Sequence, residues 1–338
     1  MKNSNLAIAV LLMSGGAASA ATGVTIYGNI NGGARYTSNA NAAGGSLVAF
    51  SDSGTYHSNR LGFKGREDLG DGMNAHFLLE ERFNSGSGAQ VGVLFNGNSY
   101  VGLGGSWGTV DLGRQYSINF KTIGAYDPFH YKYTGIVPLA GQGGITRFNN
   151  DIQYTGKSAG FTGRVEYAFG EVAGSTGDGG AQAVGGTYKA GPIVAGASYT
   201  RARPNVGTSA LPSYQEHHDW TVGGAYSLGN ARLALGYAND SQDKGAGVSD
   251  TTTKDTWIGG NYRMSSAVDL SAAFYRTRLS KAAVDGYRNL VIVGATYAFS
   301  KRTMLYADVD HGKYGGSSIP STGKDTQTGV SLGMEHVF

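Results

Sequence analysis

The sequence predicts an all-β fold, a transmembrane antiparallel β-barrel of sixteen strands whose third long loop folds inward. Three observations lead to this prediction. Polar and apolar residues alternate along most of the chain, a hairpin-sized repeat pairs one short with one long connection, and the aromatic-rich segment 116–146 has neither strand nor helix periodicity. Such a pattern is typical of a closed sheet with an apolar outside and a wet inside.

The first 20 residues are typical of an export signal. Lys2 supplies a positive charge, residues 6–13 are apolar, and Ala18-Ser19-Ala20 is a small-residue cleavage pattern. We expect cleavage after Ala20, which leaves 21–338 as a single barrel domain. The apolar stretch of the signal is too short to span a bilayer as a helix, and no later stretch is long enough to do so.

Composition excludes several classes of protein. The 338 residues include 56 Gly and 21 Tyr but no Cys, which excludes disulfides, thiol chemistry and cysteine-ligated metals. The formal net charge of +3 is small, and no block of like charge is present, so we expect no nucleic-acid partner.

Strands are predicted from alternation with a period of two residues. In segment 23–37, Val24 and Ile26 share one face while Thr25 and Asn29 share the other. Charged residues occupy the polar face of most strands, which favours a barrel with a wet interior and an apolar face turned toward lipid. The predicted strands are 23–37, 58–66, 72–84, 96–104, 108–115, 146–155, 161–169, 181–189, 192–202, 217–227, 231–240, 254–263, 268–277, 286–298, 302–311 and 326–338.

A repeat in the second half of the chain supports this arrangement. Tyrosines recur near strand ends at spacings of 34, 38, 36 and 35 residues, each before a short turn, and the following strand leads into a longer polar loop. Outer-membrane barrels close with short periplasmic turns and carry long outer loops. The alternative is a soluble sheet, but no helix or second layer is predicted to cover its apolar face. The tyrosines are Tyr154, Tyr188, Tyr226, Tyr262 and Tyr297.

Segment 116–146 is the longest predicted connection. Loops of this length without regular structure are uncommon in compact domains unless they are functional. Because it contains five aromatic residues between Phe120 and Tyr133, we expect it to pack against the protein rather than extend into solvent. A barrel of about sixteen strands encloses an aqueous channel, into which such a loop can fold.

Several motifs, in this order, resemble those of the general porins of Gram-negative outer membranes. The motifs are Val24-Thr-Ile-Tyr-Gly28, Asn59-Arg-Leu-Gly-Phe-Lys-Gly65, Glu67-Asp-Leu-Gly-Asp-Gly72, Ser99-Tyr-Val-Gly-Leu103, Gly108-Thr-Val-Asp-Leu-Gly-Arg-Gln115 and a closing strand that ends in Phe338. The resemblance implies a homotrimer of independent pores in the outer-membrane lipid, inserted by the barrel-assembly machinery. It also implies passive diffusion of ions and small hydrophilic solutes.

The resemblance further implies a pore constriction in which an inward loop faces a ladder of arginines. By motif, these arginines are Arg60, Arg114 and Arg147. Alternation supports a lumenal position for Arg60 and Arg147, whereas Arg114 shares the face of Leu112 and needs a local twist at Gly113. By alternation alone, the lumenal set also includes Arg35, Lys64, Arg82 and Glu80.

The loop departs from the family pattern. Where members of the family often carry a Pro-Glu-Phe-Gly-like stretch, this chain has Asp127-Pro128-Phe129-His130, and Lys121 and Lys132 add positive charge. Asp127 either lines the constriction or anchors the loop through backbone N–H groups. We expect weak anion preference, because fixed charge in a narrow passage biases which ions enter.

Other motifs do not indicate chemistry. Gly104-Gly-Ser106-Trp-Gly108 has the spelling of a nucleophile elbow, but a strand follows it instead of the required helix. Asp308 and Asp310 lack the further oxygen ligands of a calcium loop, and His217-His218 lacks a metal-binding pattern. We therefore expect no enzyme activity, cofactor or metal. The alternatives are a substrate-selective channel and, less favoured, a barrel enzyme or an adhesin.

Overall fold

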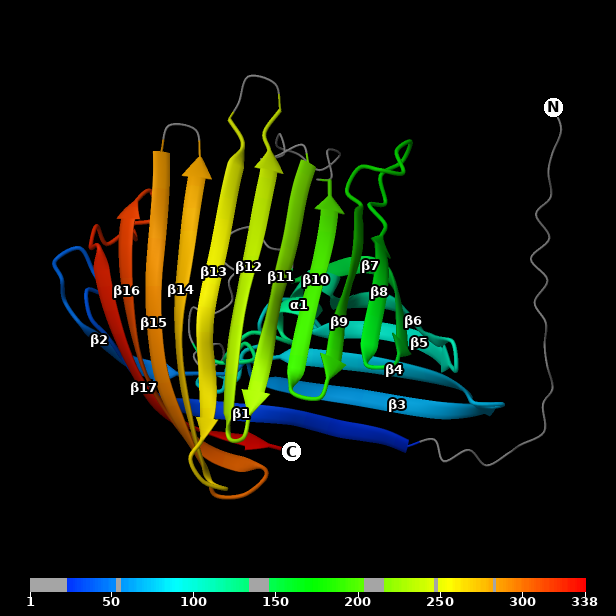
Figure 1. The fold of residues 1–338 in the computed structure, drawn as a ribbon, viewed down its shortest axis with the longest axis horizontal. Helices are drawn as coiled ribbons and strands as arrows, with labels where there is room; N and C mark the ends of the chain where they lie inside the picture. Colours follow the sequence, from blue (N-terminus) through cyan, green and yellow to red (C-terminus); the bar gives the residue numbers. More distant parts are fainter. Residues whose placement is uncertain (1–22, 53–55, 134–145, 204–215, 246–248, 282–283) are drawn as a thin grey trace.

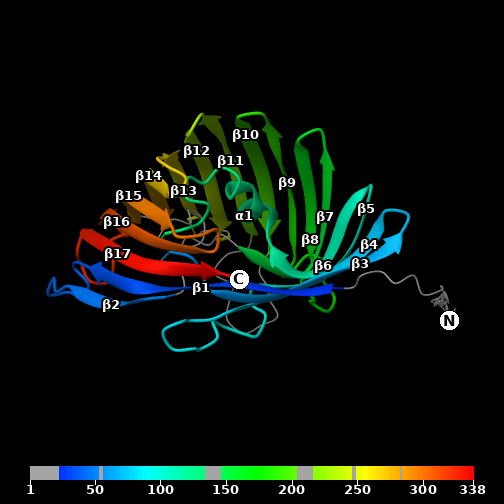
Figure 2. The same cartoon turned by 90° about the horizontal axis from the view of Figure 1, so that it is seen from below.

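The computed structural model describes residues 23–52, 56–133, 146–203, 216–245, 249–281 and 284–338, which form one antiparallel sheet closed on itself (Figures 1 and 2). The first and last strands pair to close the barrel, with Arg35 opposite Ser331. The elements are β1 (Gly23–Thr37), β2 (Leu47–Ser51), β3 (Arg60–Gly70), β4 (Met73–Arg82), β5 (Asn98–Gly105), β6 (Gly108–Tyr116), α1 (Ile118–Ile123), β7 (Arg147–Ser158), β8 (Phe161–Ala168), β9 (Ala181–Ala190), β10 (Ile193–Ala202), β11 (Glu216–Leu228), β12 (Ala231–Asp243), β13 (Thr251–Arg263), β14 (Val268–Lys281), β15 (Val284–Ala298), β16 (Thr303–Gly316) and β17 (Thr326–Val337).

Two of the seventeen labelled strands share one position in the barrel. β2 pairs with residues 33–37 of β1, and β3 pairs with residues 23–29 of the same strand. They are two parts of the second barrel strand, interrupted by residues 52–59, so the prediction of sixteen strands is confirmed. The sequence prediction missed β2 because Leu47–Phe50 is a continuous apolar run without polar alternation.

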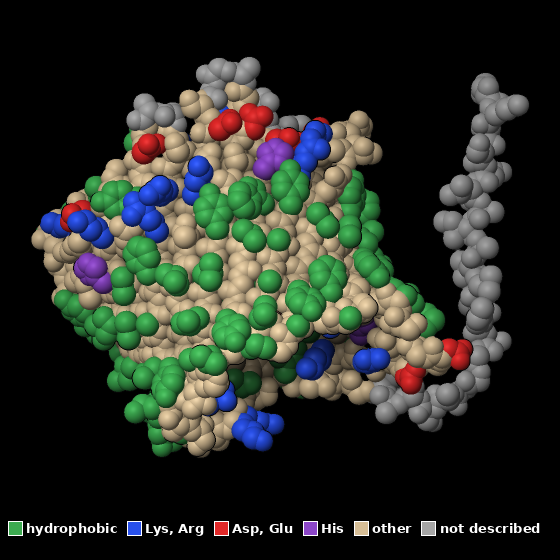
Figure 3. Space-filling view, in the orientation of Figure 1, with side chains coloured by type: hydrophobic (Ala, Val, Ile, Leu, Met, Phe, Trp, Pro, Cys, Tyr) green, Lys and Arg blue, Asp and Glu red, His purple; other side chains and the backbone are tan. Residues whose placement is uncertain are grey.

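The apolar face of the sheet is outside. Ile258 is 60% exposed, whereas its neighbour Trp257, on the opposite face, is 1% exposed. Hydrophobic side chains spread over the outer face of the barrel (Figure 3). Because these side chains would otherwise meet water, the exterior is suited to lipid, as predicted from alternation. Among the described residues, no helix is both long and apolar enough to cross a bilayer.

The connections have the predicted asymmetry. Gly229 and Asn230 alone join β11 to β12, whereas longer segments join β12 to β13 and β16 to β17 at the other end (Figure 1). The five recurring tyrosines are 40–52% exposed and lie near the short turns. The end with long loops is therefore the extracellular end.

One strand departs from simple alternation. The ladder between β6 and β7 shifts register between Gly113 and Gln115, and Asn150 has a φ of 52°. This irregularity adds a residue to β7, so that Phe148, which alternation placed on the outer face, is buried against Ala168. The extra residue turns the Phe148 side chain to the inner face.

The barrel-inserted loop and the pore constriction

The described part of the predicted loop, residues 117–133, lies inside the barrel and is called the constriction loop. The Ser117 N–H donates to the carbonyl of Thr146 at 3.0 Å, which closes the base of the loop. Ser117 also caps α1, where its side-chain oxygen accepts from the Phe120 N–H at 3.3 Å. Figure 2 shows α1 within the ring of strands, and it packs on β8 to β11. Residues 134–145 of the predicted segment lie outside the described part.

Polar side chains of the wall hold α1. The Ile118 N–H donates to Glu166 Oε2 at 3.1 Å, and Ser198 Oγ donates to Asn119 Oδ1 at 2.7 Å. The amide of Asn119 also donates to Asp219. Glu166, Ser198 and Asp219 belong to β8, β10 and β11, so the helix is fixed to several strands of one side of the barrel.

Aromatic packing holds the segment that follows. The Tyr126 ring stacks on Trp257 with centroids 5.9 Å apart, and its hydroxyl hydrogen-bonds Thr221 Oγ1 at 2.7 Å. The barrel residue at the point of closest approach to Tyr126 is Gly223. A Cβ at this position would lie 2.4 Å from the Tyr126 ring, so a larger residue would collide with it. Small wall residues thus provide the space in which the loop docks.

Asp127 anchors the loop and does not line the passage, which is the second of the two roles that the sequence left open. It is 0% exposed, and its Oδ2 accepts from the N–H groups of Phe129 at 3.1 Å and Tyr131 at 2.9 Å. Its Oδ1 accepts from the Tyr275 hydroxyl at 2.9 Å. Burial raises the pKa of Asp127 to about 6.

Lys121 is held against the wall. Its Nζ donates to Gln115 Oε1 at 3.1 Å and to Gln153 Oε1 at 2.5 Å. Burial lowers the pKa of Lys121 to about 8, because desolvation disfavours the charged form. Lys121 is thus a positive group of the constriction whose charge responds to mildly alkaline pH.

Arg82, Arg147 and Tyr116 form an arginine–tyrosine cluster beside the loop. The Arg147 guanidinium lies 4.0 Å from the centre of the Tyr116 ring, and Arg82 donates to the Tyr116 hydroxyl. The same ring stacks on Phe120 of the loop at 4.5 Å. Across the described residues, neither arginine has a carboxylate within ion-pair distance, so both charges are uncompensated locally.

The other predicted cations of the wall differ in how far they are neutralised. Arg60 Nη1 lies 3.5 Å from Glu80 Oε2, and Arg35 Nη1 lies 2.7 Å from Asp310 Oδ2. Lys64 lies over the Tyr27 ring at 5.1 Å, without a carboxylate partner among the residues described. Glu80 is buried and also accepts from the Tyr27 hydroxyl at 3.0 Å.

Arg114 does not reach the constriction loop through any described hydrogen bond. Its Nε donates to the Asn96 carbonyl at 2.9 Å, and its Nη1 donates to Asn149 Oδ1 at 2.5 Å. The predicted irregularity at Gly113 exists, with a φ of 138°, but the side chain that contacts the loop is Gln115. The lumenal position of Arg114 stays a prediction.

The sequence analysis missed a second inward segment, between β2 and β3. The Tyr133 N–H donates to the Tyr56 carbonyl at 2.7 Å, and the Tyr56 ring stacks on Tyr306 at 4.3 Å. Next to it, His57 Nδ1 lies 2.6 Å from Glu335 Oε1. The sequence signal for this inward segment was the pair of adjacent aromatic residues Tyr56 and His57 in a stretch without polar–apolar alternation.

Charge is distributed unevenly around the bore. Four acids of the inner wall, Asp151, Glu166, Asp219 and Glu80, are buried and each at most 3% exposed. The arginine–tyrosine cluster, on β4, β6 and β7, has no ion-pair partner in the described structure. The constriction loop contacts strands from β6 to β16, and the cluster adjoins it where the Tyr116 ring stacks on Phe120.

Residues considered for other chemistry lie in structural positions. Ser106 is in the turn between β5 and β6, and Asp308 and Asp310 lie near Arg35. Buried His217 Nε2 lies 2.5 Å from Asp240 Oδ2. Within the described ranges, no group of three or more His, Cys, Asp or Glu residues is placed to hold a metal ion.

A closed barrel with an apolar exterior, a polar bore and an inserted loop defines a channel-forming protein of the outer membrane. A sequence profile of the Gram-negative porins matches residues 7–317, and the chain belongs to this family. It is therefore an outer-membrane porin, a water-filled channel for the diffusion of ions and small hydrophilic solutes.

Curated relatives and solved structures agree with this assignment. The chain is 32% identical to outer membrane porin protein 32 of Delftia acidovorans and 30% identical to an outer membrane porin of Bordetella pertussis, with 100% of each chain covered in both cases. Among solved structures, it is similar to an anion-selective porin from Comamonas acidovorans, with a TM-score of 0.80 and 27% identity over 94% of this chain and 100% of that chain.

Proposed function

We propose that this porin prefers anions, and that Arg82 and Arg147, assisted by Lys64, Arg60 and Lys121, produce this preference. The observation that carries the proposal is the arginine–tyrosine cluster, which has no ion-pair partner in the described structure and lies beside a loop whose only acid between 117 and 133, Asp127, is buried. Similarity to a porin described as anion-selective supports it. A fixed positive charge raises the local concentration of anions in a narrow passage.

Reversal potentials in a KCl gradient across a planar bilayer test this proposal. We expect chloride to be more permeant than potassium at neutral pH. A potassium-preferring channel would contradict it, whatever the conductance.

A second candidate function is selectivity for organic anions. A cavity of about 410 Å³ on the lumenal side is lined by Lys132, Arg232, Phe129 and Tyr56, which combine cationic and aromatic surfaces. Such a lining suits aromatic or dicarboxylic anions. Concentration-dependent block of chloride current by benzoate or succinate, compared with acetate, distinguishes this function from simple diffusion.

We further propose that the chain is exported through residues 1–20, that 21–338 forms one barrel domain inserted by the barrel-assembly machinery, and that three copies form a homotrimer. The export motif and family membership support these steps. Intact mass of outer-membrane protein tests cleavage after Ala20. Light scattering in detergent tests the trimer, and loss of insertion on deleting Phe338 tests the assembly signal.

A further inference from the structure

His57 lies between an acid and an arginine on the inner side of the barrel wall. Its Nδ1 is 2.6 Å from Glu335 Oε1, and its Nε2 is 2.8 Å from Arg60 Nη2. The Glu335 side chain is 1% exposed, whereas those of His57 and Arg60 are 26% and 21% exposed. The imidazole therefore joins a buried carboxylate to a guanidinium that is accessible from the bore.

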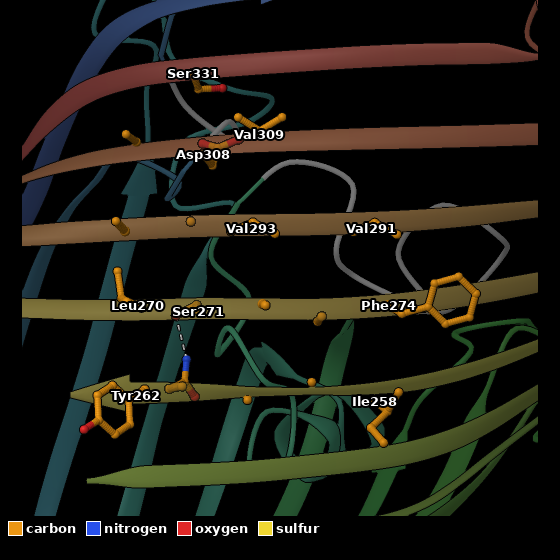
Figure 4. A pocket seen from close by; sticks show the side chains of 18 of the residues that line it. Ile258, Tyr262, Leu270, Ser271, Phe274, Val291, Val293, Asp308, Val309 and Ser331 are labelled. Carbon is orange, nitrogen blue, oxygen red and sulfur yellow. Dashed lines mark hydrogen bonds between the residues drawn. The ribbon is translucent and has the colours of Figure 1, made fainter. Parts of the chain in front are cut away.

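Glu335 is on the inner face of β17, near the seam where the last strand meets the first. It has the same facing as Ser331, four residues earlier, and Figure 4 shows Ser331 beside Asp308 of the neighbouring strand. The side-chain amide of Asn29, on β1, also donates to Glu335 Oε1 at 3.1 Å. Because the carboxylate is buried and contacted by two donors, it is a fixed acceptor for the imidazole.

The hydrogen bonds determine which nitrogen of His57 carries the proton. Arginine remains charged in proteins and has only donor groups, so His57 Nε2 accepts from Arg60. A neutral imidazole that accepts at Nε2 has its proton on Nδ1, where Glu335 accepts it. The arrangement is an arginine that donates to a neutral histidine, which in turn donates to a carboxylate.

Charged groups from several elements surround the imidazole. Glu335 favours the protonated form of His57, whereas Arg60 and Lys132 of the constriction loop disfavour it. Glu80, on β4, lies behind Arg60, with its Oε2 3.5 Å from Arg60 Nη1. Burial is the largest effect, so the pKa of His57 is lowered from its ordinary value of 6.5, and His57 is neutral at neutral pH. The phenols of the neighbouring aromatic cluster stay protonated in this range: Tyr56, Tyr133 and Tyr306.

Protonation of His57 removes the acceptor that holds Arg60. Both nitrogens of a charged imidazole are donors, so Nε2–H would point at the Nη2 donor of Arg60. The two positive charges also repel each other. Of the contacts described above, Arg60 then retains the long one with Glu80, which is a weak hydrogen bond at 3.5 Å. Each proton taken up thus adds one positive charge beside the bore and frees another from the wall.

We propose that His57 is a positioning residue for Arg60 and adjusts the ion preference of the pore to the pH. Neutral His57 holds the guanidinium against the wall, and charged His57 releases it into the passage. The inference rests on the proposed function, because it assigns Arg60 to the ion preference. Acidification should therefore make the pore more favourable to anions. A histidine that only filled space would give the same ion preference as an uncharged residue of similar size at every pH.

The test is the reversal potential of the purified porin in planar bilayers with a KCl gradient, measured as a function of pH. Between about pH 7 and about pH 5, the wild-type anion-to-cation permeability ratio should rise about twofold, the effect of one charge near the passage in screened solution. H57Q keeps an acceptor for Arg60 but cannot titrate, so it should lack this rise. H57K carries a fixed charge and should have the raised ratio at both pH values.

The comparison of wild type with H57Q isolates His57 from carboxyl groups that titrate in the same range, such as Asp127. H311Q is the matched control, because His311 is on the outer face of β16, where its Nδ1 lies 2.8 Å from Thr328 Oγ1. Its pH profile should equal that of the wild type. In E335Q, the midpoint of the rise should move to more acidic pH, because the carboxylate that favours charged His57 is removed.

Nuclear magnetic resonance tests the tautomer directly. In porin labelled with nitrogen-15 histidine, the resonance that disappears in H57Q or H57K belongs to His57, and at neutral pH it should show a proton on Nδ1 and none on Nε2. A protonated Nε2 at neutral pH would overturn the proposal, and so would identical pH profiles of wild type and H57Q. A channel that prefers potassium at neutral pH but still loses its pH response in H57Q would refute the anion preference alone.

Discussion

Replacing Arg82 and Arg147 by glutamine should remove much of the anion preference. Both guanidinium groups contact Tyr116, and neither has a carboxylate partner in the described structure. At about 8 Å from an ion in water, each charge contributes about 0.5 kcal/mol, and screening at 0.1 M salt reduces this value to about 0.2 kcal/mol. For two charges, acting with opposite sign on anion and cation, the anion-to-cation permeability ratio should fall about fivefold.

The assay is the reversal potential of single channels in a KCl gradient, repeated at high salt, where the difference should shrink. K254Q/R278Q is the matched control, because it removes the same charge from the outer surface of the barrel. An R82Q/R147Q channel with an unchanged permeability ratio and unchanged conductance would refute the assignment of selectivity to this cluster.

Three further predictions concern the constriction loop. Gly223→Leu should displace Tyr126 from the barrel wall, because even a Cβ at Gly223 would overlap the ring. The displaced loop should narrow the bore and lower single-channel conductance. Unchanged conductance would contradict this packing. Asp127→Ala should leave two buried N–H groups without an acceptor, at about 1–3 kcal/mol each, and raise open-channel noise and protease cleavage of the loop. Burial lowers the pKa of Lys121 to about 8, so its positive charge is present at neutral pH and lost as the pH rises. The anion preference should therefore fall between about pH 7 and 9. This pH-dependent fall should be absent in K121M.

The barrel fold could be predicted because the alternation of polar and apolar residues is a local property of each strand. Closing the sheet into a barrel does not change this alternation. Exposed Ile258 beside buried Trp257 is the outcome expected from a period of two residues. The second strand was only partly predicted, since Leu47–Phe50 has no polar partner positions to show the period.

The constriction was less predictable because its contacts join residues far apart in sequence. Whether Asp127 would anchor the loop or line the bore depended on Tyr275, which is 148 residues away, and on the turn that brings two N–H groups to its carboxylate. The facing of Phe148 was predicted wrongly because one inserted residue in β7 shifts the alternation at this point. Irregularities of this kind have weak sequence signals unless a glycine marks them.

The inward segment between β2 and β3 connects the narrowing of the bore to barrel assembly. Tyr56 contacts Tyr133 of the loop and Tyr306 of β16, while His57 contacts Glu335 of β17. These contacts join the beginning of the chain to its end across the closure of the barrel. The width of the bore therefore depends in part on the closed cylinder as well as on the strands that hold α1.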